Sequence, residues 1–456
     1  MVEFVSAVTE LLSQKVTIFI GAFVLVLVIV INFFRLPKQK RGKVQSPVRD
    51  PLPVKVPSDH VPNNKHKKKQ PNEKWSQKLS KQNYTHQWMM TSLKGHTAQV
   101  NDMDFSSNGK YLATCAEDRV VFIWSTKDFI NKDHKYMRFN IDFDHASHVC
   151  WSPDSKAFVI NKVIENNLEV YKVTRKADGW VSSVTKAKTF AKQYEEETIG
   201  IGIAINGKFM MSCSSKNQMI LYDLKGSVLA KVDTYLINTF SAKISPCGRF
   251  VAASGFAPDV KVWEVQYNKS GEFKQVKRAY ELKGHTAGVY DFSFNADSTR
   301  MATVSKDGTW KVFDIKIEFE KGEDPHLLKT GSYKNLSNSA HLALSPNGEV
   351  LAIATGSSLY FFSTITGDCD KTISNIYNGN ITKVLFDSAG DYVLTSGEKH
   401  VRVFHNVTGY RTTIASARQK LKMSGNSAAT KERLENMIKN AEIFLAKIGE
   451  PLRGGG

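Results

Sequence analysis

An all-β fold made of repeated antiparallel sheets is the class that this sequence of 456 residues predicts. The main observation is a spacing that occurs twice: a Gly-His pair is followed by an Asp and then by a closing aromatic residue, at the same intervals in both copies. The two sets are His96, Asp118 and Trp124, and His285, Asp307 and Phe313. The second observation is that weaker copies of this pattern occupy the chain between and after them.

The copies can be counted by their closing aromatic residues, which recur about every 41 to 51 residues. These residues are Trp124, Tyr171, Tyr222, Trp263, Phe313, Phe362 and Phe404. A turn precedes each one, at Asn108-Gly109, Asp154-Ser155, Asn206-Gly207, Cys247-Gly248, Asp297-Ser298, Asn347-Gly348 and Ala389-Gly390. Apolar or alternating segments lie between turn and aromatic residue, as in strands joined by tight turns. Seven such units predict a seven-bladed β-propeller, and the alternative is a β-sandwich.

Four longer segments carry a family resemblance. Residues 104–116, 245–252, 258–265 and 305–311 resemble the WD-repeat family. The resemblance covers residues 86–410 and implies one closed ring that acts as a binding platform for proteins, with no cofactor and no small-molecule substrate. The segments resemble in particular a member of this family that lies in the membrane of the endoplasmic reticulum. The resemblance therefore also implies this location and a stress-responsive protein kinase of the unfolded protein response as a partner.

In the WD-repeat family a His, a Ser or Thr, an Asp and a Trp form one buried polar network. The matching residues here are His96, Thr114, Asp118 and Trp124, and in the second copy His285, Thr303 and Asp307. An unpaired buried polar group costs about 1–3 kcal/mol, so every member must have a partner. Phe313 cannot donate a hydrogen bond, so we expect a truncated second network. General acid–base catalysis is the alternative use of a His-Asp pair, and the repeat favours the structural one.

A membrane anchor is predicted near the N-terminus. Residues 16–34 contain no charged side chain, and a helix of this length spans about 28 Å, close to the ~30 Å hydrocarbon core of a bilayer. The alternative is a cleavable signal peptide, which has a shorter apolar region, a basic start and small residues at its end. The acidic residues Glu3 and Glu10 and the segment 33–37, Phe-Phe-Arg-Leu-Pro, favour an uncleaved anchor.

The charges on either side of the anchor predict its orientation. Five Lys or Arg residues lie in 35–43, whereas the other flank has Lys15 alone. Because Lys and Arg stay on the cytoplasmic side, residues 1–15 should be luminal and everything after residue 35 cytosolic. The five cysteines form no CxxC pair, as expected of reduced thiols in the cytosol. An anchor of this length also suits the thin bilayer of the endoplasmic reticulum.

Residues 35–85 are predicted to form a basic, Pro-rich, disordered tether. They contain 14 Lys or Arg residues against Asp50, Asp59 and Glu73, so they hold +11 of the net charge of +18. High charge with low hydrophobicity cannot offset the entropy of ordering a chain. Three interpretations remain for Lys65, Lys67, Lys68 and Lys69. They are a solvated tether, a contact with anionic lipid headgroups, and a contact with RNA or the ribosome.

The two ends of the predicted ring carry further signals. The last blade lacks an outer strand, which we expect from residues 86–93, because this pairing removes an open sheet edge. Residues 411–456 are predicted to form a helical tail, in which Leu434, Ile438, Ala441, Leu445 and Ile448 lie on one face. Thr430 is the expected cap. The apolar face either packs on the flank of the propeller or binds a partner helix.

Catalysis is not indicated by any motif of the chain. The P-loop, HExxH and GxSxG patterns are absent from the sequence, and the cysteines and histidines have no metal-ligand spacing. The leading hypothesis is a membrane-anchored scaffold, and the second is an RNA- or ribosome-associated factor that uses the basic tether and the propeller in translational control. An enzyme is the third, since propeller enzymes assemble their sites from separate loops.

Overall fold

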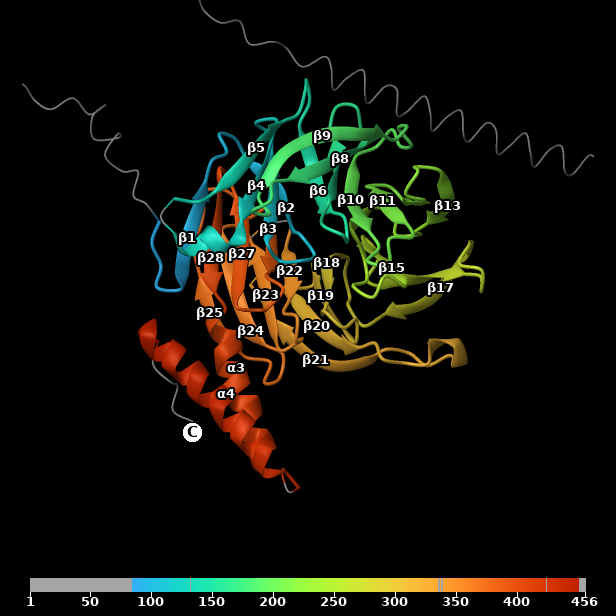
Figure 1. Cartoon of the computed structure of the whole chain (residues 1–456). Helices are drawn as coiled ribbons and strands as arrows, with labels where there is room; N and C mark the ends of the chain where they lie inside the picture. Colours follow the sequence, from blue (N-terminus) through green and yellow to red (C-terminus); the bar gives the residue numbers. More distant parts are fainter. Residues whose placement is uncertain (1–83, 132, 335–336, 338, 424, 451–456) are drawn as a thin grey trace, which may run out of the picture. The chain divides into compact units, whose positions relative to one another are not determined.

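The computed structural model describes residues 84–131, 133–334, 337, 339–423 and 425–450. Its strands form seven antiparallel four-stranded sheets, which follow one another around a ring in chain order (Figure 1). The predicted seven-bladed propeller is therefore confirmed. The predicted luminal segment, anchor and nearly all of the tether lie outside the described residues. Within the described part, no helix is both long enough and apolar enough to cross a membrane.

The strands of each blade run from the innermost to the outermost in chain order, except in the last blade. The first three blades contain β2 (Val100–Phe105), β3 (Tyr111–Ala116), β4 (Val120–Ser125) and β5 (Tyr136–Asn140); β6 (Ala146–Trp151), β7 (Ala157–Lys162), β8 (Leu168–Arg175) and β9 (Val181–Thr189); and β10 (Thr198–Ile203), β11 (Met210–Ser214), β12 (Gln218–Tyr222) and β13 (Val228–Asp233). The next two contain β14 (Thr239–Ile244), β15 (Phe250–Gly255), β16 (Val260–Tyr267) and β17 (Phe273–Leu282); and β18 (Val289–Phe294), β19 (Arg300–Ser305), β20 (Thr309–Asp314) and β21 (His326–Ser332).

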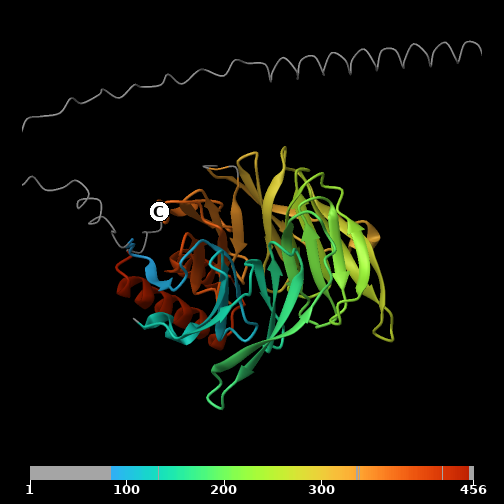
Figure 2. The ribbon, with the colours of Figure 1, turned by 90° about the horizontal axis from the view of Figure 1, so that it is seen from above.

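The sixth blade contains β22 (His341–Leu344), β23 (Val350–Thr355), β24 (Ser358–Ser363) and β25 (Cys369–Ile373), and the seventh β26 (Lys383–Phe386), β27 (Tyr392–Gly397), β28 (His400–His405) and β1 (Met89–Lys94). Short 3-10 helices η1 (Thr126–Ile130) and η2 (Phe319–Lys321) follow β4 and precede β21. The innermost strands contact one another from blade to blade, and β26 contacts β2. The view from above shows the blades arranged in this order (Figure 2).

Each predicted turn joins the first two strands of a blade and includes a residue with positive φ. These residues are Gly109, Ser155, Gly207, Gly248, Ser298, Gly348 and Gly390. In the first blade the Gly109 N–H donates to the Ser106 carbonyl at 2.7 Å, while Asn108 Oδ1 accepts from the Lys110 N–H at 3.0 Å. Gly adopts this left-handed conformation readily, and Asn or Asp side chains satisfy the turn backbone. The turn chemistry thus explains why the pattern was visible in the sequence.

Seven hydrophobic clusters form the core, one between each pair of neighbouring blades. The cluster between the first two blades, for example, packs Ile123 of β4 against Trp151 and Phe158. The cluster between the seventh and first blades contains Leu93, Trp124 and Val403. Each sheet is therefore covered on both faces by its neighbours, and no blade has a separate core of its own.

The ring is closed by the N-terminal strand, as predicted. Strand β1 pairs antiparallel with β28, with Leu93 opposite Val401 and a bulge between Met89 and Thr91. This pairing gives the seventh blade the fourth strand that its own segment lacks. A sheet with all four strands in place keeps the edge of β28 from pairing with another chain.

Two helices follow the propeller within the described residues, where the sequence predicted one. The first, α3 (Val407–Leu421), crosses the expected boundary at residue 410, and the second is α4 (Ala428–Lys447). The expected cap was wrong: the Ser427 side chain caps α4 and accepts from the Thr430 N–H. Ser427 precedes the first helical turn, which is where a cap must lie.

The apolar face of α4 packs on the propeller, which was one of the two predicted alternatives. Ala441 and Leu445 join the cluster between the sixth and seventh blades, together with Ile414 of α3 and Phe361 and Phe404 of the sheets. Figure 1 shows both helices below β24 and β25. The tail therefore covers the blade that closes the ring.

A polar clasp joins the tail to the N-terminal strand. Glu450 accepts from Trp88 Nε1 at 2.5 Å and from Arg411 Nη2 at 2.6 Å, and Arg411 also contacts Asp370 at 2.9 Å. The Gln87 side-chain amide donates to the carbonyls of residues 448 and 449 at 2.9 Å. Both ends of the described chain are thus fixed to the same blade.

Replacing Glu450 with Ala should lower the free energy of unfolding by roughly 1–3 kcal/mol, because it leaves buried Trp88 Nε1 without its acceptor. The matched control is Glu442→Ala, which breaks the exposed Arg418–Glu442 pair at 2.8 Å and should cost about 0.5 kcal/mol or less. Urea unfolding of both variants measures the difference. Equal losses in the two variants would contradict the clasp.

Candidate functional site

The first predicted polar network joins residues of three elements. Nδ1 of His96, in the loop before β2, lies 3.0 Å from Asp118 Oδ2, and its Nε2 lies 2.8 Å from Thr114 Oγ1 on β3. Trp124 Nε1 on β4 donates to the same hydroxyl at 3.0 Å. The hydrogen bonds can all be directed one way: the Trp124 indole donates to the Thr114 hydroxyl, this hydroxyl donates to His96 Nε2, and His96 Nδ1 donates to the Asp118 carboxylate. Every side chain of the set has a partner.

The Asp118 carboxylate is also bound to its surrounding backbone. It accepts from the N–H groups of Thr97 and Val120 at 2.8 and 3.1 Å. Burial alone raises the pKa of Asp118, but the hydrogen bonds from His96 and Thr97 outweigh it and hold this pKa below its usual value. The carboxylate is therefore ionised and fully engaged at neutral pH, as a structural member of the blade.

The second network has the same core and ends earlier. His285 Nδ1 lies 3.0 Å from Asp307 Oδ2, and its Nε2 lies 2.8 Å from Thr303 Oγ1. Phe313 lies on β20 where the first network has its Trp, so no indole reaches Thr303. Thr309 adds a hydroxyl that donates to Asp307 Oδ1 at 2.6 Å. Against the effect of burial, these bonds lower the pKa of Asp307 to about 2.

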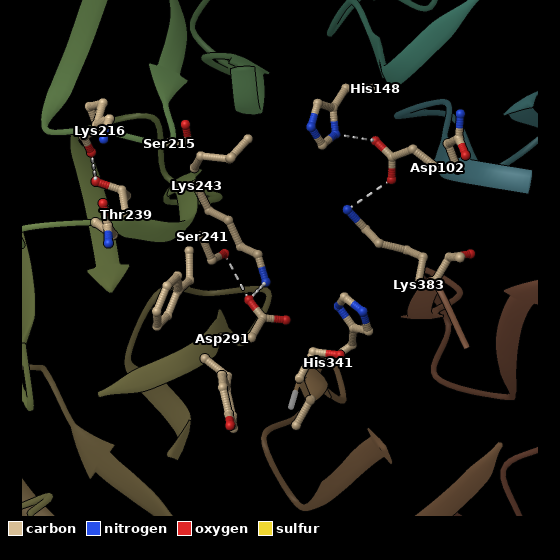
Figure 3. A pocket seen from close by; sticks show the side chains of 18 residues that line it. Asp102, His148, Ser215, Lys216, Thr239, Ser241, Lys243, Asp291, His341 and Lys383 are labelled. Atoms are coloured by element: carbon tan, nitrogen blue, oxygen red, sulfur yellow. Dashed lines mark hydrogen bonds and ion pairs between the residues drawn. The ribbon is translucent and has the colours of Figure 1, made fainter. Parts of the chain in front are cut away.

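A ring of residues at the centre of the propeller, polar in every blade but the third, was not anticipated from the sequence. On the innermost strand of each blade, one residue occupies an equivalent position. It lies opposite the second-to-last residue of the next strand in the sheet. These residues are Asp102, His148, Gly200, Ser241, Asp291, His341 and Lys383. Several of them line a central hollow of about 540 Å³ (Figure 3). Aligning the seven repeats by their turns would have brought these positions together.

One ion-pair group in this ring centres on Asp102. Lys383 Nζ lies 2.9 Å from Asp102 Oδ1, and His148 Nδ1 lies 3.3 Å from Oδ2. Oδ2 also accepts from the Val149 N–H at 3.2 Å. Burial raises the pKa of Asp102, but the Lys383 ammonium brings it well below its usual range. The carboxylate of the first blade is thus tied to the second and seventh blades.

A second group centres on Asp291 in the fifth blade. Lys243 Nζ and Ser241 Oγ, both on β14, lie 2.6 and 2.8 Å from Asp291 Oδ1. Asp291 Oδ2 accepts from the Leu342 N–H of β22 at 2.9 Å. Burial lowers the pKa of Lys243. Burial raises the pKa of Asp291, but Lys243, His341 and the Leu342 N–H together outweigh it and lower this pKa. These side chains bind the fourth, fifth and sixth blades together around the central hollow (Figure 3), which is the channel of the propeller.

The hydrogen bonds and ion pairs of both groups link strands of neighbouring blades, which is a structural role. The two ionised carboxylates of the ring are each paired with an ammonium group and a backbone N–H, so neither is placed to exchange protons with a substrate. In the described part of the chain, no group of three or more His, Cys, Asp and Glu side chains could hold a metal ion. The predicted contact residues Lys65, Lys67, Lys68 and Lys69 lie outside the described residues.

Replacing Thr114 with Val should destabilise the protein more than the same change at Thr303. Thr114 serves both His96 and Trp124, whereas Thr303 serves His285 alone, so the first variant leaves one more buried group unpaired. We expect an additional loss of about 1–3 kcal/mol in the free energy of unfolding. Chemical denaturation of the two variants, side by side, measures it. A larger loss at Thr303 would contradict the assigned networks.

Asp104, two residues after Asp102 on β2, should make the stability of the protein depend on pH. Burial raises the pKa of Asp104 to about 7, so between about pH 4 and 7 the native state holds a proton that the unfolded chain has lost. Its contribution to stability therefore falls as the pH rises. Asp104→Asn, which stays neutral, should gain roughly 1–3 kcal/mol over wild type between pH 5 and pH 8.

The control for this pH dependence is Asp154→Asn. Asp154 is exposed, and hydrogen bonds from Ser152 and Lys156 lower its pKa despite some burial. Its contribution to stability is therefore lost only in acid, below the range of the experiment, and this variant should keep a constant difference from wild type. Parallel pH profiles for wild type and Asp104→Asn would contradict the raised pKa.

Comparisons with known proteins agree with the geometry. The model of the family "WD domain, G-beta repeat" matches residues 88–125 and 276–314, which contain the two polar networks. Transducin beta-like protein 2 of Homo sapiens is 44% identical over 375 residues, covering 82% of this chain and 84% of the relative. The Mus musculus protein of that name is 43% identical, covering 84% and 87%. Apoptotic protease-activating factor 1 of Danio rerio is 22% identical over 48% of this chain and 17% of its own length. The chain therefore belongs to the WD-repeat β-propeller family and, within it, to the transducin beta-like protein 2 family.

Proposed function

We propose that this protein is a non-enzymatic scaffold whose propeller binds other proteins. The observation that carries the proposal is the state of the polar residues: in both networks and in both ion-pair groups of the channel, each His and Asp side chain is engaged by residues of the same chain. WD-repeat propellers are typically non-catalytic scaffolds. The propeller therefore presents other molecules with a shaped surface rather than with reactive groups.

The proposed location is the membrane of the endoplasmic reticulum, with the propeller in the cytosol. Support comes from the uncharged residues 16–34 and from the excess of Lys and Arg in 35–43, which retains this flank on the cytoplasmic side. All five cysteines of the propeller are free thiols, which fits a reducing compartment. The organelle itself rests on the family resemblance and on the length of the anchor.

The proposed partner is a stress-responsive protein kinase in the same membrane, within the unfolded protein response. A tether of about 50 residues keeps the propeller within a short distance of the bilayer, so that a partner in that membrane meets it at high effective concentration. A contact of low intrinsic affinity is then sufficient. The class of partner is taken from the family resemblance. The proposed membrane topology gives the physical reason for a tether.

A second candidate is an RNA- or ribosome-associated factor acting in translational control. The observation that favours it is the net charge of +11 in residues 35–85, including Lys65, Lys67, Lys68 and Lys69. Clustered Lys side chains bind phosphate backbones by displacing counterions, so such binding weakens steeply as salt increases. The two candidates therefore differ in which part of the chain they require.

The membrane-anchored scaffold predicts that the anchor can be exchanged but not removed. In intact microsomes, added protease should digest the propeller or its tether. Asn83, which begins the glycosylation sequon Asn-Tyr-Thr, should carry no glycan. A protein without residues 1–34 should still bind the kinase in vitro. The kinase should no longer co-purify with this protein from cells. An unrelated anchor of the same length and orientation should restore recovery, because the bilayer selects length and flanking charge.

Lysine substitutions separate the two candidates. Changing Lys65, Lys67, Lys68 and Lys69 to Gln should leave kinase recovery unchanged if the propeller is the binding element. Loss of function in this variant, with the protein still folded and in the membrane, would instead favour the RNA-associated factor. Glycosylation at Asn83, or a propeller protected from protease, would contradict the proposed orientation.

A further inference from the structure

Four large apolar side chains are exposed together on the third and fourth blades. They are Tyr235 and Ile237 in the loop from β13 to β14, Phe240 near the start of β14, and Phe256 in the loop from β15 to β16, with 68%, 64%, 40% and 55% of their surfaces accessible. We call these four residues the rim ridge. The Phe256 N–H bonds to the Asn238 carbonyl, so the two loops are neighbours. Large apolar side chains that are exposed on neighbouring loops, rather than scattered singly, point to a binding site.

The backbone of the rim ridge is held in an unfavourable conformation. Tyr235 has φ of 52° and Ile237 has φ of 69°, in the left-handed region that Gly normally occupies. For a β-branched residue such as Ile this conformation is rare, and it costs about 1–3 kcal/mol. Folding alone would favour Gly at residue 237, and solvent would favour a polar side chain. An exposed Ile satisfies neither, which points to a use for its side chain.

The loops beneath the rim ridge are firmly braced. The Phe256 N–H donates to the Asn238 carbonyl at 2.9 Å, and this carbonyl lies only 2.0 Å from where a Cβ on Gly255 would stand. Lys261 Nζ donates to the Tyr235 carbonyl at 2.8 Å. The apolar side chains are therefore presented on a rigid base, which reduces the entropy lost on binding.

The rim ridge adjoins the mouth of the central hollow. Phe240 and Lys216 both line the hollow, and the Phe240 ring lies 6.2 Å from that of Tyr290. The charged lining consists of Lys216, Lys243 and Lys383 against Asp102 and Asp291, and the last two Lys are paired with these Asp residues. Lys216 is exposed and forms no ion pair with a described residue, so the mouth has an excess of one positive charge.

We propose that the rim ridge and Lys216 form a docking site for a peptide segment of a partner protein that carries a large apolar side chain close to an Asp or Glu. The apolar side chain packs on Ile237 and Phe256, and the carboxylate lies at the mouth beside Lys216. A hollow of about 540 Å³ admits a few side chains but not a folded domain. The proposal rests on the proposed scaffold function and specifies the surface and the partner chemistry.

The test selects phage-displayed random linear peptides on the purified full-length chain. Enriched peptides should combine a large apolar residue with Asp or Glu. Their affinity, measured by fluorescence polarisation, should fall roughly tenfold or more in Ile237→Gly, as for an anchor residue. Lys216→Glu should weaken binding as well, and more at low salt, since it replaces attraction by repulsion. The control Ile443→Ser, at an exposed residue of α4, should bind as wild type does.

Ile237→Gly also separates binding from folding. Gly tolerates the left-handed conformation, so this variant should unfold at the same or a higher temperature than wild type while its peptide affinity falls. Phe256→Ser, with a normal φ, provides the second loss-of-anchor variant.

Three results would overturn the proposal: no enriched peptide, peptides without a carboxylate, or peptides that bind Ile237→Gly and Lys216→Glu as tightly as wild type. Binding only when phosphoserine replaces the Asp or Glu would also overturn it, in favour of a phosphorylated partner. The scaffold function is judged separately by recovery of the kinase. If recovery persists in Ile237→Gly, the rim ridge fails as the docking site and the scaffold does not.

Discussion

Pairing of β1 with β28 is the constraint on which the rest of the propeller depends. The last sheet receives its outer strand from the other end of the chain, and this pairing fastens the seventh blade to the segment that leads into the first. Without it, the cluster between the seventh and first blades would lose Leu93, and β28 would have an open edge. The two tail helices and the Glu450 clasp act on this same blade, so the structure concentrates its reinforcement at the one joint that chain connectivity does not make.

Polar side chains strengthen the propeller in two different places. The His-Thr-Asp networks connect the loop before a blade to its second and third strands, within the sheet. The carboxylates Asp102 and Asp291 connect each of their blades to its two neighbours around the central hollow. Both kinds of contact place ionised groups away from water, which is favourable only when all partners are present. The hydrophobic clusters supply adhesion between blades, and these polar contacts fix how neighbouring sheets are aligned.

The sequence predicted the features that depend on local chemistry. The turns were recognisable because residues such as Gly109 and Asn108 are required by the turn backbone, and the blades could then be counted from their closing aromatic residues. Ring closure followed from the missing strand. Helix α3 was not recognised as a separate helix that starts at residue 407, because Val407, Gly409 and Thr412 are poor helix formers. Its stability comes from tertiary contacts such as Arg411 with Asp370, which no local pattern records.

The channel ring was missed for a related reason. Asp102, Asp291 and Lys383 are separated by long stretches of sequence and look like ordinary polar residues of half-buried strands. Only the seven-fold register makes them neighbours. The rim ridge could not be predicted for the opposite reason. Tyr235 and Ile237 look like core residues in the sequence, and only the folded structure shows that they are exposed.

Ring closure by distant segments also has a consequence for biosynthesis. Gln87 and Gly449, which meet at the clasp, are 362 residues apart in the chain. Strand β1 is among the first parts of the propeller to leave the ribosome, yet its partner β28 is almost the last. During translation β1 must stay unpaired while six blades form beside it, and contacts of such long range form slowly. A nascent chain that stops before β28 leaves β1 without its partner strand, so the propeller closes only when nearly all of its residues have been synthesised.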